Sequence, residues 1–550
     1  MINRIKIKSF NNNAFNEKYK IFLIKKTDDT SIIKEKEPLI YSTYYEDSKT
    51  FYVLTPIDKT KNDLYNMYPD FHYIVKEVNC IEIPDYVLLN LLINKLPNKE
   101  LKFNNLTATL YEIFDNKKEQ RITLCYSITK ELILSCHVKT FTFAKDVNIK
   151  KMTGKTQKAI NEGKLSAYKE EGNYIVRGQD KGTYLINRSF ANPRKNMVEY
   201  FSISEFDNKA YMMTDLLNSI NIENYQFIEV CFDDVDYKRV LEEKRTQNQT
   251  FEDIIDCLPK ETKLNVVDYC DCKEKLTKVL DKLQANYEFN EKLDENKLNL
   301  CVVKSKDSYK ENNEQDRYIK SANIPIQNIE DKSINETSIK QCLLELVIKY
   351  EAILNSILTT DLQGKWAFYA YINKTPHVLK IEDNKIIQMT SLEIPDNVLA
   401  LMEERKDKKP KIIFKDDKYL IITDTEIRLL PDYNQFTKKR NEYVIEKEDK
   451  RINKARSQRN KLFGEIIDVN TFKFQNAKYL SIGEIGYGMN TSIENSPSTR
   501  RIEENGLEIE DIAYLFSPNI CQLNKYAITP HPYKVMNEMF IINGGIIDSE

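Results

Sequence analysis

Residues 297–306 read KLNLCVVKSK, and this stretch indicates the kind of sheet in the second half of the chain. A short, continuously apolar run bounded by lysines is typical of a strand inside a parallel sheet. Residues 263–270, KLNVVDYC, form a second such run, and residues 274–283, EKLTKVLDKL, predict a helix between the two. One face of that helix is apolar and is formed by Leu276, Val279, Leu280 and Leu283. Alternating strands and helices predict a Rossmann-like parallel sheet with a ligand crevice at the strand ends.

A longer helix follows over residues 338–358 and buries one face against this sheet. Its predicted buried positions are Ile339, Leu343, Leu346, Val347 and Tyr350. Upstream, residues 226–232, QFIEVCF, are predicted to add a further buried strand to the same region. Between the strand at 297–306 and the long helix lies DRYIKSANIPIQNI, residues 316–329, in which one Gln interrupts an apolar run.

Three polar side chains around this segment have the chemistry of a phosphate pocket. Lys320 and Lys349 are cations on flexible stems, and the amide of Gln327 can donate to an oxygen while it fixes the geometry. We expect Lys349, near the middle of the predicted helix, to point back across the preceding loop, which would place Gln327 at the crevice end of the sheet. Ordinary surface lysines beside a rim glutamine are the alternative reading of the same residues.

The order of these elements resembles the MID domain of the Argonaute/PIWI superfamily. In that family a Lys, a Gln and a Lys on the following helix hold the 5′ end of a guide strand, which implies this role for Lys320, Gln327 and Lys349. The family often has Tyr or His four residues before the first Lys, where this chain has Asp316, and Tyr318 is out of step. The resemblance therefore does not extend to stacking on the first guide base.

The region from 361 to 550 is predicted to open with three antiparallel strands, followed by a helix at 395–406 and further strands. That order is similar to the RNase H-like PIWI domain, in which acidic residues bind two metal ions. The first catalytic Asp would fall in KWAFYAYI, residues 365–372, which contains no carboxylate, and the last falls on Asn537. The resemblance implies no catalytic residues and no catalytic metal.

The C-terminal segments narrow the resemblance to the PIWI-RE branch, which is named for an Arg and a Glu. The motifs are KYLSIGEIGYG, STRRIEENGLEIEDIAYLFS and ITPHPYKVMNEMFI, and they imply Arg500 or Arg501 with Glu508 as a pair that contacts the nucleic-acid backbone. A structural ion pair is the competing interpretation. Residues 437–461 contain ten Lys or Arg residues and four Asp or Glu residues. This excess of positive charge predicts either a solvated helix or a surface that contacts phosphates. Its cations include Arg451, Lys454, Arg456 and Arg459.

Length and composition limit the class of protein to which the chain could belong. The chain has 550 residues, 41% of them hydrophobic, and 82 Lys+Arg nearly balance 84 Asp+Glu, so net charge favours neither nucleic acid nor a membrane. Ten scattered Cys and the lack of a long apolar run indicate a cytoplasmic protein with no membrane segment. We predict an α/β multidomain architecture: a β-rich domain at 1–115, a linker or small domain at 116–200, a MID-like domain at 201–360 and a PIWI domain at 361–550.

The resemblance implies a guide-directed nucleic-acid binding protein of prokaryotic defence against plasmids or phage. Its partners would be a short guide RNA or DNA, the complementary target strand, and a helicase or nuclease that destroys the target. No cofactor is required, with Mg²⁺ at the guide 5′ end as an option. Two alternatives stay open: an active nuclease that uses an acidic cluster, and an interaction scaffold without a nucleic-acid role. The candidate acidic residues are Asp416, Asp417, Asp424 and Glu426.

Overall fold

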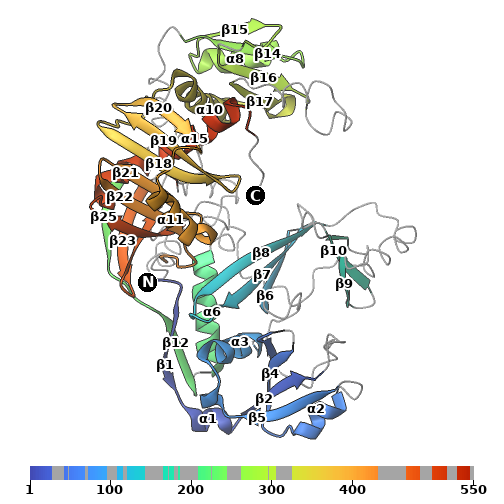
Figure 1. Cartoon of the computed structure of the whole chain (residues 1–550). Coiled ribbons are helices and arrows are strands. Elements are labelled where there is room, and N and C mark those ends of the chain that lie inside the picture. The colour runs from blue at the N-terminus through green and yellow to red at the C-terminus, as the bar shows by residue number, and fades with distance from the viewer. Residues whose placement is uncertain are drawn as a thin grey trace, which may run out of the picture. The chain divides into compact units, whose positions relative to one another are not determined.

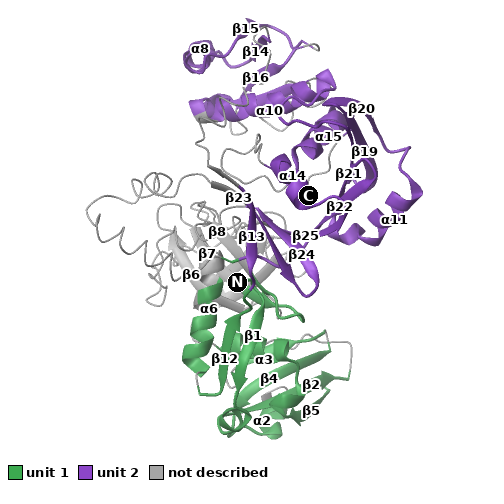
Figure 2. Cartoon of the chain, turned by 90° about the vertical axis from the view of Figure 1, so that its left-hand side faces the viewer, with its two compact units in different colours: residues 1–234, 430–433, 491–496 green, residues 235–429, 434–490, 497–550 purple. Residues whose placement is uncertain are grey.

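The structure is a computed structural model of the chain. It describes residues 1–27, 42–47, 49–67, 72–95, 108–115, 120–142, 165–170, 173–178, 184–185, 209–224, 226–244, 262–294, 297–304, 325–430, 466–482, 498–516 and 529–545. The chain divides into two compact units, coloured separately in Figure 2. Unit 1 comprises Met1–Asp234 with two short later segments, and unit 2 comprises the rest. The finer four-domain division stays a prediction.

Unit 1 is built mainly from small antiparallel sheets (Figure 1). A four-stranded sheet has the order β3-β4-β2-β5, and two three-stranded sheets have the orders β6-β7-β8 and β11-β10-β9. The strands are β1 (Ile5–Phe10), β2 (Tyr19–Lys26), β3 (Ser42–Tyr45), β4 (Thr50–Pro56), β5 (Tyr73–Val78), β6 (Ala108–Asp115), β7 (Gln120–Ile128), β8 (Leu134–Thr142), β9 (Leu165–Glu170), β10 (Asn173–Gly178), β11 (Tyr184–Leu185) and β12 (Ile228–Phe232).

The helices of unit 1 are α1 (Asn12–Asn16), α2 (Lys61–Met67), α3 (Asp85–Lys95) and α6 (Lys209–Asn224). Every residue of α3 from Tyr86 to Asn94 is buried, because strands β3, β4 and β7 and helix α6 all contact this helix. A helix that is apolar all round is the expected sequence for such an enclosed position. Its two asparagines, Asn90 and Asn94, donate to backbone carbonyls and so satisfy their buried amides.

One strand that the sequence predicted for the parallel sheet lies elsewhere. Residues 226–232 contain β12, which pairs antiparallel with β1 in unit 1. In β12, buried Ile228 and Val230 flank exposed Glu229. This alternation belongs to a half-buried antiparallel strand and not to the continuously buried strand of a parallel sheet.

The parallel sheet of unit 2 contains the two predicted strands and is covered by the two predicted helices, and it adds two strands that the sequence did not predict. Its order is β15-β14-β16-β17, and all three pairings are parallel. The strands are β14 (Leu264–Asp268), β15 (Tyr287–Asn290), β16 (Asn299–Val303) and β17 (Ile326–Glu330), and the helices are α8 (Lys273–Lys282) and α10 (Glu336–Leu354). The predicted helical residues Leu276 and Leu280 are fully buried, as are Ile339 and Val347 on α10.

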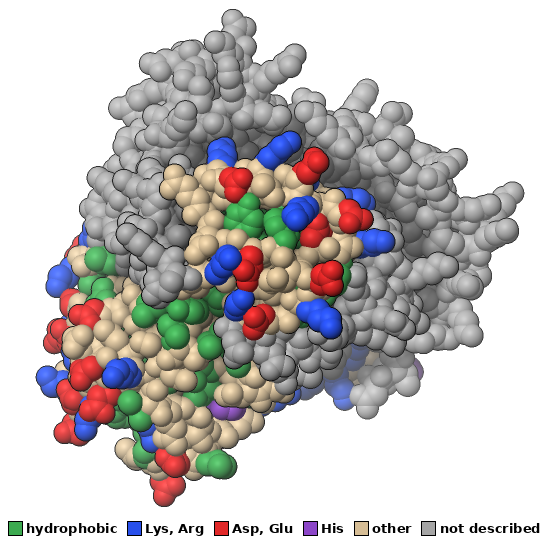
Figure 3. Space-filling model, turned by 90° about the horizontal axis from the view of Figure 1, so that it is seen from above, with side chains coloured by type: hydrophobic (Ala, Val, Ile, Leu, Met, Phe, Trp, Pro, Cys, Tyr) green, Lys and Arg blue, Asp and Glu red, His purple; other side chains and the backbone are tan. Residues whose placement is uncertain are grey.

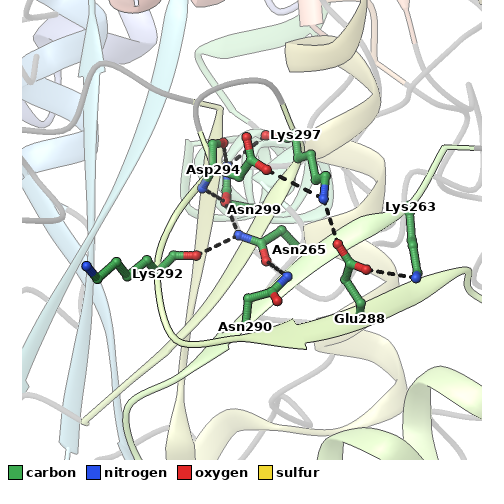
Figure 4. A network of polar contacts seen from close by, with 8 residues as sticks. All are labelled: Lys263, Asn265, Glu288, Asn290, Lys292, Asp294, Lys297 and Asn299. Carbon is green, nitrogen blue, oxygen red and sulfur yellow. Dashed lines mark hydrogen bonds and ion pairs between the residues drawn. The ribbon is translucent and has the colours of Figure 1, made fainter.

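The connection from β15 to β16 spans residues 291–298, which is shorter than the dozen or more residues usual for a parallel crossover. Two fully buried asparagines, Asn265 on β14 and Asn299 on β16, hold this connection (Figure 4). Asn299 Nδ2 donates to the carbonyls of Asp294 (2.8 Å), Lys297 (2.7 Å) and Pro325 (3.0 Å). Asn265 Nδ2 donates to Asn299 Oδ1 (2.7 Å) and to the Lys292 carbonyl (3.0 Å). Side-chain amides therefore satisfy the backbone groups of a tight crossover.

The other large part of unit 2 is a nine-stranded sheet with the order β13-β23-β24-β25-β22-β21-β18-β19-β20. Its strands are β13 (Tyr237–Lys244), β18 (Lys365–Ile372), β19 (Thr375–Glu382), β20 (Lys385–Thr390), β21 (Lys411–Lys415), β22 (Lys418–Asp424), β23 (Ile466–Phe474), β24 (Ala477–Ile482) and β25 (Ser498–Asn505). The predicted opening of three antiparallel strands followed by a helix is confirmed. All pairings within this sheet are antiparallel, so this region is α+β by its strand directions, and its RNase H-like assignment stays a prediction.

Helices cover both faces of the nine-stranded sheet. They are α11 (Asp396–Glu404), α14 (Ile509–Ile512) and α15 (His531–Ile542). Val398 and Met402 of α11 pack on one face with Tyr369, and Tyr533 of α15 packs on the other with Phe368. Helix α10 also contacts α15, so the parallel sheet and the nine-stranded sheet share one hydrophobic core. Within the described ranges, none of the helices has the length and apolar character needed to cross a membrane.

Candidate nucleic-acid interface

Gln327 lies on a strand and not on the loop that the sequence predicted. It is the second residue of β17 and pairs with Leu300 of β16, which places it toward the amino end of the parallel sheet. Asn299 fixes the start of β17, because both its backbone N–H (2.9 Å) and its side-chain amide (3.0 Å) donate to the Pro325 carbonyl. The expected position at the carboxyl crevice end is therefore wrong.

Lys349 and Gln327 meet as the sequence predicted. Lys349 Nζ donates to Gln327 Oε1 at 3.1 Å and to the carbonyl of Ile326. An ammonium group has no acceptor, so the amide oxygen must face Lys349, and the amide NH₂ of Gln327 is left as a donor. No other residue in the described ranges accepts from that NH₂ group. Lys320, the third member of the predicted pocket, lies outside the described residues.

The surroundings of Lys349 contain carboxyl groups that the sequence interpretation missed. Glu345 precedes Lys349 by one turn of α10, and Glu538 comes from α15. Burial raises the pKa of both carboxyl groups, and the positive charge of Lys349 opposes this rise in each case. The i, i+4 spacing of Glu345 and Lys349 is a sequence signal that could have revealed part of this cluster.

Figure 3 shows one face of the molecule, on whose described part Lys and Arg side chains are interspersed with Asp and Glu side chains. Around the parallel sheet, several lysines form local ion pairs, among them Lys282–Glu336 (2.5 Å) and Lys263–Glu288 (2.7 Å). The two lysines beside Glu288 lower its pKa to about 2. Because the described Lys and Arg side chains on this face lie among carboxylates, they do not form an extended positive patch there.

The candidate pair of Arg500 or Arg501 with Glu508 is not formed. Arg500, on β25, donates through Nε to Asp424 (3.0 Å) and through Nη1 to the Thr499 carbonyl (3.0 Å). Arg501 Nε lies 3.6 Å from Glu503. Glu508 instead caps helix α14 in a capping box with Asp511. The sequence interpretation missed the actual partners because they lie on neighbouring strands or two residues along the same strand.

Arg428 is a further cation near Arg500 that the sequence interpretation did not single out. Its Nη1 donates to the carbonyls of Thr425 (2.7 Å) and Thr499 (3.2 Å). Burial lowers the pKa of Arg428, and the nearby charge of Arg500 lowers it further. These contacts hold the turn that follows β22 against β25, which is a structural use of the charge. The basic residues Arg451, Lys454, Arg456 and Arg459 lie outside the described residues.

The four acidic residues proposed for a nuclease do not form one cluster. Asp416 and Asp417 form the turn between β21 and β22, where Asp416 has a positive φ of 53°. Asp424 is the last residue of seven-residue β22, roughly 20 Å away along the strand. Two catalytic metal ions must lie roughly 4 Å apart, so these residues cannot share such a site. Asn537 is exposed on α15.

No group of three His, Cys, Asp or Glu side chains that could hold a metal ion occurs in the described ranges. A divalent ion at the guide 5′ end therefore stays a prediction.

A hydroxyl, an imidazole and a carboxylate meet where α10 reaches α15. His531 Nε2 lies 2.6 Å from Glu351 Oε2 and 2.8 Å from Thr359 Oγ1. Both partners use the same ring nitrogen, whereas a nucleophile relay requires opposite nitrogens. Glu351 and His531 are also 0% exposed. This triplet is a buried junction that fixes the C-terminal end of α10, the helix that carries Lys349.

No protein-family model and no curated protein match the sequence. Among solved structures, the chain aligns with the Argonaute protein from Methanocaldcoccus janaschii at 9% identity and a TM-score of 0.37. The alignment covers 100% of this chain and 97% of that chain. A TM-score below 0.5 does not place the chain in a family, so Argonaute membership enters only as a proposal below.

Proposed function

We propose that this chain binds the phosphorylated 5′ end of a short nucleic-acid strand at Gln327 and Lys349. The contact between Lys349 Nζ and Gln327 Oε1, at 3.1 Å, carries the proposal. It joins strand β17 of the parallel sheet to helix α10, which follows that strand, and it leaves hydrogen-bond donors on both side chains. Lys349 uses two of its three N–H donors in the described contacts, and Gln327 keeps its amide NH₂.

A terminal phosphate is the anion that suits these donors. A phosphate monoester carries a charge of about −1.5 to −2 at pH 7 and offers three acceptor oxygens. One ammonium and one amide can bind two of those oxygens, and the charge-assisted bond from the lysine would be the stronger. Lys320 would supply a second cation, as the family resemblance implies. A strand with a 5′ hydroxyl lacks the charge and two of the acceptors.

The family resemblance extends this proposal to a guide. The bound strand would pair with a complementary target, so base pairing would supply specificity while the protein reads backbone shape and charge. In this proposal the chain is Argonaute-like and closest to PIWI-RE, and it acts in defence against plasmids or phage. Target destruction would belong to a partner helicase or nuclease, because the proposed acidic residues lie at opposite ends of one strand.

The test compares the two end groups. Affinity for a 5′-phosphorylated strand and for the same strand with a 5′ hydroxyl is measured for the full chain and for Lys349→Met and Gln327→Ala. The matched control is Lys340→Met on the same helix, where Lys340 pairs with Glu336 at 3.2 Å. Loss of a charge-assisted hydrogen bond should weaken binding of the phosphorylated strand by roughly tenfold or more for Lys349→Met, and by less for Gln327→Ala.

The hydroxyl-ended strand should bind the variants and the parent chain alike, and the control should bind both strands as the parent does. Equal losses for the two strands in Lys349→Met would remove the proposed pocket. Sequencing the short strands that copurify from the native host would show whether the guide is RNA or DNA. Copurification of no short nucleic acid, together with affinities no tighter than about 10⁻⁴ to 10⁻⁶ M, would favour a scaffold.

A further inference from the structure

Two neighbouring strands of the nine-stranded sheet bury polar side chains whose hydrogen-bonding groups are unsatisfied. Asn470 on β23 and Ser481 on β24 are both 0% exposed. Among the residues that the structure describes, neither amide atom of Asn470 has a hydrogen-bond partner, and the hydroxyl of Ser481 has none either. Buried polar groups in folded proteins are almost always hydrogen-bonded, so these two side chains require a physical explanation.

The two side chains are cross-strand neighbours. Asn470 and Ser481 are directly opposite each other in the antiparallel pairing of β23 with β24. Directly opposite residues point to the same face of a sheet, and their Cβ atoms are roughly 5 Å apart. The two side chains are nevertheless not bonded to each other. A third group that lies between them and reaches both would satisfy them together.

The pair lies on the face of the sheet opposite the shared hydrophobic core. The residues that precede the pair in the chain, Val469 and Leu480, belong to that core, and successive side chains of a strand point to opposite faces. Two residues along from Asn470 on the same face, Phe472 stacks on Tyr479 with ring centroids 5.2 Å apart. The face therefore changes from aromatic packing to polar groups at the pair, and an apolar ligand does not suit it.

The chemistry of the pair identifies the ligand. A carboxamide has donor N–H groups and an acceptor oxygen, and a hydroxyl both donates and accepts, so the ligand must do both as well. Both side chains are neutral, and a buried ion requires a charged partner. Arg239, opposite Asn470 on β13, is exposed, and the described residues include no group of three His, Cys, Asp or Glu that could hold a metal ion. The small neutral molecule that both donates and accepts is water.

We propose that ordered water binds between Asn470 and Ser481 and connects β23 to β24 through their side chains. A buried water molecule makes about three hydrogen bonds, and the amide nitrogen, the amide oxygen and the hydroxyl supply partners for them. Ordering a water molecule costs less free energy than leaving a buried amide and hydroxyl unsatisfied. Strand β23 lies between β24 and β13, the last strand of the sheet, so the water would strengthen the attachment of this end. The site does not involve Gln327 or Lys349 and is independent of the proposed function.

The first test is a double-mutant cycle, measured by hydrogen exchange of the backbone amides of β23 and β24 in the full chain. Asn470→Leu and Ser481→Ala each remove a partner of the water, so each should speed exchange. Because the double variant leaves neither group unsatisfied, its acceleration should fall short of the product of the two single effects by about fivefold or more. The matched control combines Asn470→Leu with Thr499→Val, whose effects should multiply. Thr499 is also 0% exposed and lies opposite Ser481 on β25, but its hydroxyl already accepts from the backbone N–H of Leu429 (3.2 Å).

A second measurement uses the unmodified chain and so does not depend on the variants folding. In a crystal structure of the full chain, a solvent peak should lie about 2.7–3.2 Å from the Ser481 hydroxyl and from an amide atom of Asn470. A protein group that bonds to either side chain at that position, or the absence of any peak, overturns the inference. Effects of Asn470→Leu and Ser481→Ala that multiply, as those of the control pair do, overturn it as well.

Discussion

The parallel sheet and the nine-stranded sheet both carry side chains that the sequence assigns to nucleic acid, but they use them differently. In the parallel sheet, Lys349 reaches Gln327 and both keep donors beyond that contact. In the nine-stranded sheet, Arg500 is bonded to Asp424, and Glu508 caps a helix. The partners of a charged side chain thus distinguish a ligand site from a structural one when residue type does not.

The MID-like and PIWI-RE resemblances also differ in how many of the contacts they predict are present. The MID-like reading brings Lys320, Gln327 and Lys349 together; Lys349 and Gln327 are in contact, and Lys320 lies outside the described residues. The PIWI-RE reading predicts an Arg–Glu pair on the segment from 498 to 517, but Arg500 pairs with Asp424 of β22 and Glu508 caps α14. The case for nucleic-acid binding therefore rests on the parallel sheet, and the nine-stranded sheet contributes the core and helix α15 that support it.

One polar link between the two regions is the buried junction of Glu351 with His531. Glu351 Oε1 accepts from the backbone N–H groups of Leu358 (2.7 Å) and Thr359 (2.9 Å), while Oε2 meets His531. Glu351→Ala would leave these buried groups unsatisfied and should destabilise the fold by roughly 3–5 kcal/mol. Hydrogen exchange along α10 measures the effect. Unchanged protection of α10 would show that the two regions do not depend on this junction.

The same junction predicts acid sensitivity. Despite burial, the His531 interaction and the hydrogen bonds from Leu358 and Thr359 hold the pKa of Glu351 below its ordinary value of 4.5. A carboxyl group with a depressed pKa in the folded state stabilises the fold above its unfolded pKa. That contribution is lost as the pH falls below about 4.5 through the lower folded value. Exchange rates along α10 should rise in that range, and the rise should be absent in Glu351→Ala.

A somewhat smaller effect is expected from the crossover of the parallel sheet. Asn299→Ala removes three side-chain donations to backbone carbonyls from a fully buried position and should cost about 3 kcal/mol. Protection of β16 and β17 should fall, and binding of the phosphorylated strand should weaken with it, because Asn299 fixes the start of β17. Asn328→Ala is the matched control, since Asn328 is exposed on β17. Equal effects of the two substitutions would contradict the role of the buried amides.

Arg500→Ala tests whether the nine-stranded sheet contributes to nucleic-acid binding. The ion pair with Asp424 has one largely buried and one half-exposed partner, and such pairs contribute about 0–1 kcal/mol. We expect a small loss of thermal stability and less than about a twofold change in affinity for either strand. A loss that rivals that of Lys349→Met would move the nucleic-acid site to the nine-stranded sheet.

The smallest effect is predicted for Asp416→Ala. Asp416 lies in a hairpin turn, roughly 20 Å along β22 from Asp424, so it should contribute nothing to strand cleavage. The purified chain is incubated with guide, complementary target and Mn²⁺, and the products are resolved by size. Target cleavage that Asp416→Ala abolishes would restore the nuclease interpretation.

Sequence periodicity identified many of the elements but not their partners, and it missed strands β15 and β17. Continuous apolar runs identified β14 and β16, and the helical spacing of Leu276 and Leu280 identified α8. The alternation of β12 was overlooked, and that strand pairs with β1 from the far end of unit 1. Pairing across such distances in sequence has no local signal, so register and sheet membership could not be derived from one chain alone.

The same limit applies to the candidate site. The meeting of Lys349 and Gln327 was predicted, but with Gln327 on a loop at the carboxyl end of the sheet. In the structure the two residues meet because α10 follows β17 and brings Lys349 back to the start of that strand. The interaction of Glu538 with Lys349 was not predictable from the sequence, because it depends on how α15 packs on α10. Buried amides such as Asn299 are also difficult to recognise, since an Asn within an apolar run reads as an interruption until its backbone partners are known.

A structure of the full chain bound to a short 5′-phosphorylated strand tests the central claim most directly. The account predicts that the terminal phosphate lies within hydrogen-bonding distance of Lys349 Nζ and the Gln327 amide nitrogen. A phosphorylated end bound at Arg500, or a strand whose 5′ end does not approach β17, would contradict it.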